Sequence, residues 1–141
     1  MVFRFLPHTA DIFIEAEGKT LEEAFEETAK GLSQLMFSKA LSAKERVSKK
    51  ISIESEDLNS LLYDFLTQFL IFRDGENLLF SKVKIISLKS EPPFKLEAIL
   101  SGEEINFQKH KPNMDVKAIT YHEMSIEKTK NGYKIKVLVD I

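Results

Sequence analysis

The pattern of hydrophobic and polar residues predicts strands at the start of the chain. Phe3 and Phe5 alternate with polar or surface positions, which predicts a short strand that ends at Pro7. A second alternation runs over residues 11–17, with the isoleucines on one side and acidic residues mainly on the other. This period of two is typical of a half-buried strand. Gly18 closes it.

Two later stretches show the period of a helix. The sequence TLEE predicts a capping box, in which the Thr20 hydroxyl accepts from the Glu23 amide and the Glu23 side chain returns to the Thr20 amide. Asp57 can cap a second helix, which should end near Asp74-Gly75. Apolar side chains recur three and four residues apart in both helices, so each has one face that packs against a core.

The rest of the chain reads as strands. Apolar and polar residues alternate over residues 45–55, which predicts a half-buried strand. Beyond residue 78, four strand segments are expected, at 78–90, 94–104, 115–129 and 133–141. The last two are joined through Asn131-Gly132, a strong hairpin signal. The order predicts an α+β fold: a single domain over residues 1–141, with a mostly antiparallel or mixed sheet and two amphipathic helices packed on one face.

One stretch fits neither period. Residues 101–114, SGEEINFQKHKPNM, read as a long irregular loop. A loop of that length inside a compact domain is usually functional or mobile, so residues 101–114 are expected to be one or the other.

Composition narrows the function classes. The chain has 141 residues, 20 basic and 22 acidic side chains and a net charge of −2, which argues against nonspecific nucleic-acid binding. It has no cysteine, so disulfides, thiolate zinc sites and a cysteine nucleophile are excluded. No signal peptide and no membrane-spanning run of about 20 apolar residues are recognisable, and a cytoplasmic protein is expected.

Nucleotide-binding glycine patterns, hydrolase elbows, zinc-protease motifs and EF-hand loops are all missing from the sequence. Two polar clusters remain in its interior. The first combines His8, Thr9 and Asp11; its alternative reading is a loop with local hydrogen bonds. The second is KAITYH, in which Thr120 and His122 would share one face of a strand; its alternative reading is a solvated sheet face.

The third cluster is the end of the sequence, KVLVDI. Asp140 and the terminal oxygens of Ile141 bring anionic groups together, and hard divalent cations prefer such oxygen ligands. A frayed, charged end is the alternative, although the apolar alternation continues to the last residue. If the strands that carry Asp11 and Asp140 are neighbours, the two carboxylates could share one cation.

Long pieces of the sequence resemble the archease family. They are HTADIFIEAEG at 8–18, DLNSLLYDFLTQFL at 57–70, GEEINFQKHKPNMDVKAITYH at 102–122 and VLVDI at 137–141. The resemblance implies a small cytosolic accessory protein that promotes guanylylation and multiple turnover of an RtcB-type RNA ligase in tRNA splicing. It also implies a broadened choice of nucleoside triphosphate by the ligase. RNA would be contacted only indirectly.

The resemblance also implies a site. Asp11, Asp140 and an oxygen of Ile141 would hold a divalent cation, with Ca²⁺ expected in structures and Mg²⁺ or Mn²⁺ as alternatives. Outer or partner-contacting roles would fall to His8, Lys117, His122, Asn106 and Lys109. The last two stand where the family often has Asp and Arg, which leaves the role of the 101–114 loop open. The alternatives are a metal-dependent phosphohydrolase and a chaperone-like protein-binding module.

Overall fold

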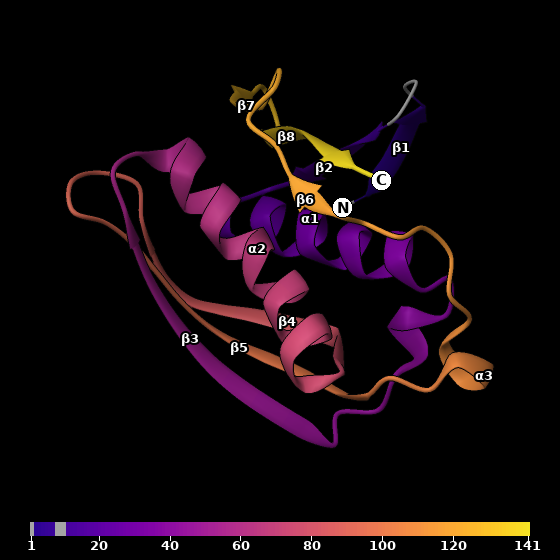
Figure 1. Cartoon of the computed structure of the whole chain (residues 1–141). Coiled ribbons are helices and arrows are strands. Elements are labelled where there is room, and N and C mark those ends of the chain that lie inside the picture. The colour runs from indigo at the N-terminus through magenta and orange to yellow at the C-terminus, as the bar shows by residue number, and fades with distance from the viewer. Residues whose placement is uncertain (1, 8–10) are drawn as a thin grey trace.

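The computed structural model describes residues 2–7 and 11–141, and its strands form two antiparallel sheets with the main helices between them (Figure 1). The first sheet contains β1 (Phe3–Pro7), β2 (Asp11–Gly18), β8 (Gly132–Asp140), β6 (Ala118–Ile119) and β7 (Ser125–Thr129). β6 and β7 pair with the same strand, β8. The second sheet has the order β3 (Val47–Ser55), β5 (Phe94–Glu104), β4 (Leu78–Lys89).

Two long helices, α1 (Leu21–Met36) and α2 (Leu58–Glu76), fill the space between the sheets, and two short ones, η1 (Ala40–Ser42) and α3 (Phe107–His110), lie in the connections. The Thr20 hydroxyl accepts from the Glu23 amide at 3.1 Å, as the sequence predicts. The Glu23 carboxylate accepts instead from the Lys19 amide, so the predicted return bond to Thr20 is wrong.

The second helix has the complete capping box, with reciprocal bonds between Asp57 and Ser60. It runs past the predicted end at Asp74-Gly75 and stops at Asn77, whose φ of 55° lies in the left-handed region. A side chain at Gly75 would meet nothing within 4 Å, so packing does not require a glycine there. Its only effect on α2 is the low helix propensity of glycine. Within the described ranges, no helix is long and apolar enough to cross a membrane.

The inner faces of both sheets and both helices form one continuous core. α1 contacts β2 in the first sheet and β4 in the second, while Phe25 and Phe65 join the two helices with ring centroids 5.9 Å apart. Ile14 and Val137 of the first sheet and Leu96 of the second are fully buried in the same cluster. The α+β class is confirmed, with the strands divided between two sheets.

Two predicted segments differ from the structure. Residues 115–129 are not one strand, because β6 ends at Ile119 and a turn with Glu123 at φ 52° precedes β7. Residues 101–114 are not one irregular loop either, since β5 continues to Glu104 and α3 follows. Main-chain bonds then tie the segment to α1, from the Asn113 amide to Met36 and from the Met114 amide to Leu35.

Candidate functional site

The register of β2 and β8 sets Asp11 directly opposite Asp140. Opposed residues of an antiparallel pair have Cα atoms about 4.5–5.5 Å apart, and their side chains point to the same face. The next pair, Ile12 and Val139, belongs to the core, so the two aspartates lie on the outer face, away from the helices. The expectation that these two strands are neighbours is confirmed.

Strand β6 fixes the other side of Asp140. Ala118 pairs with Asp140, and the Lys117 amide donates to the Asp140 carbonyl at 2.8 Å. The Thr120 amide and hydroxyl both donate to the carbonyl of Leu138, at 3.0 and 2.8 Å. Asp140 is therefore held between two strands, and the alternative of a frayed end is wrong.

Farther along the same outer face, the charges alternate in sign. Glu15 is buried and accepts from Arg4 Nε at 2.8 Å, with Lys134 Nζ 3.0 Å away. Burial raises the pKa of Glu15, but the hydrogen bonds from Arg4 and Lys134 outweigh it and leave the pKa below its ordinary value. At the other end of the pair formed by β2 and β8, two carboxylates, Asp11 and Asp140, lie directly opposite each other.

Opposed like charges destabilise a strand pair, and a bound cation would turn that repulsion into attraction. The donors at this edge are two carboxylates and the main-chain oxygen of Ile141, a hard oxygen set that fits Ca²⁺ or Mg²⁺. Among the described residues, no group of three or more His, Cys, Asp or Glu side chains is arranged to hold a metal. Two carboxylates, a main-chain oxygen and water are thus the ligands that the edge offers.

The remaining predicted residues near this edge have different positions. His8 lies outside the described residues. Lys117 is one of the residues that line a hollow of about 390 Å³ beside α2, with Tyr63. His122 is exposed in the turn after β6, with Nε2 3.1 Å from Glu123 Oε2. Because that turn interrupts the strand, the predicted shared strand face of Thr120 and His122 is wrong.

The same turn exposes an aromatic pair that the sequence interpretation missed. Tyr121 stacks on Tyr63 of α2 with ring centroids 4.3 Å apart and remains 52% exposed. Treating KAITYH as continuous strand placed Tyr121 beside Ile119, which is in fact buried. No local pattern in the sequence links Tyr63 to Tyr121, because the two residues are far apart along the chain.

The other two candidates, Asn106 and Lys109, stabilise α3. The Asn106 side-chain oxygen accepts from the amides of Gln108 and Lys109, both at 3.0 Å. Lys109 Nζ forms a 2.6 Å ion pair with Glu103 at the end of β5. The structure thus brings Asp11, Asp140, Ile141 and Lys117 to one edge and gives Asn106 and Lys109 local contacts elsewhere.

Glu103 is the centre of this second cluster. Besides Lys109, the Lys44 amide donates to its carboxylate at 2.8 Å, and Nε2 of the fully buried His110 lies 3.2 Å from the same oxygen. The Asn106 amide donates to His110 Nδ1 at 2.9 Å, so the ring proton is on Nε2 and points at Glu103. The hydrogen bond from Lys109 outweighs burial and, with Lys44 and His110, lowers the pKa of Glu103 to about 2.

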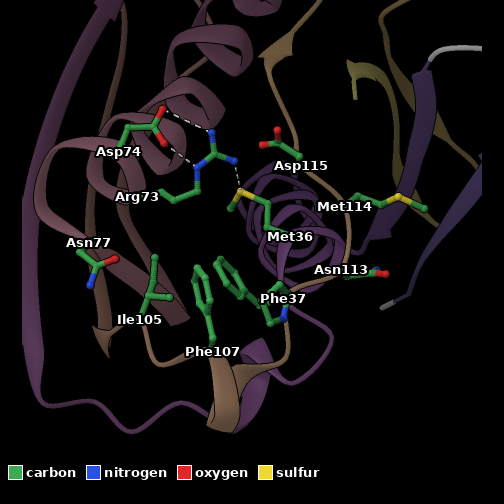
Figure 2. A pocket seen from close by; sticks show the side chains of 11 residues that line it. Met36, Phe37, Arg73, Asp74, Asn77, Ile105, Phe107, Asn113, Met114 and Asp115 are labelled. Atoms are coloured by element: carbon green, nitrogen blue, oxygen red, sulfur yellow. Dashed lines mark hydrogen bonds and ion pairs between the residues drawn. The ribbon is translucent and has the colours of Figure 1, made fainter.

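A hollow of about 440 Å³ opens between the ends of α1 and α2 and the segment around α3 (Figure 2). Met36, Phe37 and Phe107 form much of its wall. Arg73 pairs with Asp74 at 2.8 Å and its Nη1 lies 3.2 Å from the Met36 sulfur, and Asp115 adds a second carboxylate to the pocket wall. Among the predicted site residues that the structure describes, none lines this hollow.

Comparisons with known proteins cover nearly the whole chain. The model of the Archease protein family (MTH1598/TM1083) matches residues 3–141. An archease of Thermococcus kodakarensis is 47% identical over 126 residues, covering 89% of this chain and 87% of the relative. An archease of Sulfurisphaera tokodaii is 37% identical and covers 99% of this chain and 98% of its own length.

Two solved structures share the fold. The solution structure of protein 1598 of Methanobacterium thermoautotrophicum has a TM-score of 0.83 and 35% identity, covering 99% of this chain and 98% of that one. The crystal structure of a Thermotoga maritima protein, described as an archease and possible chaperone, has a TM-score of 0.63 and 21% identity, covering 96% of this chain and 94% of that one. The second likeness bears on the fold alone.

Proposed function

This chain belongs to the archease family, and from that premise we propose that it is an accessory protein of an RtcB-type RNA ligase in tRNA splicing. In this proposal it promotes guanylylation of the ligase and restores multiple turnover, and it broadens the ligase's choice of nucleoside triphosphate. It does so without carrying out the ligation itself.

The observation that carries the proposal is the opposition of Asp11 and Asp140 across β2 and β8. The two carboxylates, with the main-chain oxygen of Ile141, would hold a divalent cation, Ca²⁺ or else Mg²⁺ or Mn²⁺, on an outer sheet face that a partner can reach. A divalent cation there would neutralise charge on a triphosphate, as such ions do in nucleotidyl and phosphoryl transfer.

The chain's own residues would position this group. The Lys117 amide, bonded to the Asp140 carbonyl, fixes the end of β8 next to β6. Lys117 also lines the hollow beside α2, so its ammonium group would add a positive contact for the ligase or its nucleotide next to this edge, on the helix side of the sheet. His8 and His122 would contact the partner from the flanking segments. This arrangement requires no RNA contact at the edge.

The test is multiple-turnover RNA ligation by a purified RtcB-type ligase with added Asp11→Ala or Asp140→Ala protein. We expect stimulation to fall at least about tenfold, because changing even the outer-shell partners of metal ligands costs about 10–100-fold. The matched control is Glu17→Ala, which removes an exposed carboxylate from the same strand, opposite Lys134. Full stimulation by either folded aspartate variant would overturn the site.

The same experiment separates the alternatives. Phosphate release from RNA or nucleotides by the chain alone, abolished by Asp140→Ala, would indicate a metal-dependent phosphohydrolase instead. Protection of many unfolded proteins, unchanged in Asp11→Ala, would indicate a chaperone-like module. Ca²⁺ binding measured by calorimetry on the wild type and on both aspartate variants checks the cation independently of any partner.

A further inference from the structure

The outer face of the second sheet carries an excess of lysine. Figure 1 shows α1 and α2 on one side of β3, β5 and β4 only. The register gives the residues on the opposite side, because side chains alternate along each strand. Its charged residues are five lysines and three glutamates: Lys50, Lys82, Lys84, Lys89, Lys95, Glu54, Glu97 and the buried Glu103. We call this surface the lysine face.

The lysines lie in rows that cross the sheet. Lys50 of β3 and Lys84 of β4 flank Ile99 of β5 in one row, and Lys82 lies beside the hydrogen-bonded pair Ser48 and Ser101 in the next. Residues two apart on a strand are separated by about 7 Å, and alternate strands by about 10 Å. Positive charge is therefore gathered in two neighbouring rows, at Lys82 and at Lys50 and Lys84, while the next row has Glu97 and no lysine.

Few of these charges are neutralised within the chain. Lys95 and Lys82 have only long ion pairs, 3.9 Å to Glu54 and 3.7 Å to Glu45. Lys50, Lys84 and Lys89 take part in none of the ion pairs found among the described residues. The chain as a whole has a net charge of −2, whereas this face has more lysines than carboxylates and is positive. Net charge therefore does not exclude an anionic partner here.

The composition of the face favours a nucleic acid over an acidic protein as its anionic partner. Protein interfaces are enriched in aromatic residues, Met and Arg and depleted in Lys, and this face has lysines, serines and isoleucines without an aromatic side chain. Lysine ammonium and serine hydroxyl groups are what contacts nucleic-acid phosphates, whereas base stacking needs aromatic side chains. We propose that the lysine face binds the phosphate backbone of a nucleic acid, without reading its sequence.

The proposed cation site at Asp11 and Asp140, which we call the cation edge, lies on the outer face of the other sheet. Binding of a nucleic acid to the lysine face would therefore be a separate function. It would hold RNA close to a partner that works on RNA, through a weak and salt-sensitive contact. Nonspecific binding of this kind has dissociation constants of about 10⁻⁴–10⁻⁶ M at physiological salt.

The test is fluorescence anisotropy of labelled oligouridylate, oligoadenylate and oligothymidylate with the full chain, over a series of salt concentrations. We expect the two RNA sequences to bind within about twofold of each other. Lys50→Gln/Lys84→Gln should weaken binding about tenfold and reduce the slope of log affinity against log salt by about 1.4, or 0.7 for each lost phosphate contact. Equal binding of the thymidylate would show that the backbone, and not the 2′-hydroxyl, is recognised.

The control removes the same charge elsewhere. Lys39→Gln/Lys130→Gln changes two exposed lysines outside the lysine face and should leave binding within about twofold of wild type. An equal loss in both double variants, or no binding of any oligonucleotide at low salt, would overturn the proposal. Tighter binding of polyglutamate than of RNA would assign the face to an acidic protein instead. Asp140→Ala should bind RNA as wild type does, which separates this face from the cation edge.

Discussion

The two carboxylate clusters of this fold differ in what surrounds the negative charge. Glu103 is buried and accepts from Lys109, from the Lys44 amide and from the buried ring of His110. Asp11 and Asp140 instead face each other across a strand pair, on an outer sheet face. A carboxylate surrounded by donors from its own chain stabilises the fold. Two carboxylates set in register repel each other, and a divalent cation between them would offset that repulsion.

The two clusters also differ in their sequence context. Glu103 lies in a stretch that the sequence marked as a functional or mobile loop, whereas the structure makes it the anchor of α3 and of the segment before β3. The proposed cation site, at Asp11 and Asp140, is built from two strands that are far apart in the sequence. The comparison teaches that a polar stretch becomes a functional candidate only once its hydrogen-bond partners are known.

The largest effect is expected from removing the charge of Glu103. Glu103→Gln keeps the size of the side chain but loses its charge-assisted bonds and leaves the ammonium group of Lys109 facing an amide. We expect the free energy of unfolding to fall by about 3 kcal/mol, measured by urea denaturation. At temperatures where the variant is folded, stimulation of the ligase should equal that of wild type.

Glu104 provides the control for this substitution. It follows Glu103 on β5 but is exposed, so Glu104→Gln should change the free energy of unfolding by no more than about 0.5 kcal/mol. If the two variants lose the same stability, the Glu103 cluster is not the anchor that its contacts indicate. If Glu103→Gln abolishes stimulation while folded, the division between the two clusters is wrong.

Acid should remove the same stabilisation without a mutation. The pKa of Glu103 is lowered from an ordinary 4.5 to about 2, so its contribution is fully present above pH 4.5 and is lost as pH falls through about 2. It amounts to at most about 3 kcal/mol, at 1.4 kcal/mol for each pKa unit. The stability gap between wild type and Glu103→Gln should therefore shrink by about half between about pH 6 and about pH 3. A constant gap would contradict this origin of the stability.

Much of the fold follows from local patterns. Alternation predicts β2 and β8, the caps at Thr20 and Asp57 predict the starts of both long helices, and Asn131-Gly132 predicts the final hairpin. Each of these depends on residues close together in the sequence. The pairing of Asp11 with Asp140 needed one more step, namely that two alternating strands at opposite ends of the sequence are neighbours.

The largest errors fall in residues 101–129, where distant contacts decide the structure. The segment after β5 is ordered because the His110 ring contacts Glu103 and the Asn113 amide donates to Met36, and neither contact is visible in the local pattern. The strand after Ile119 breaks even though Thr120 still bonds to Leu138, because the chain turns at Glu123 and stacks Tyr121 on α2. Alternation continues through the break, so period alone could not locate it.

The smallest expected effect is the one that separates the clusters most cleanly. Asp140→Asn removes one of two opposed charges, so in the presence of a chelator we expect the free energy of unfolding to rise by about 0.2–1 kcal/mol. Glu17→Gln, which removes a charge opposite Lys134, should lower it by a similar amount. Saturating Ca²⁺ should then raise the melting temperature of wild type and of Glu17→Gln but not of Asp140→Asn, because only a ligand that binds the native state stabilises it. If Asp140→Asn loses as much stability as Glu103→Gln, the Asp140 carboxylate is also stabilised by its own chain. Both clusters would then stabilise the fold, and the contrast between them would be wrong.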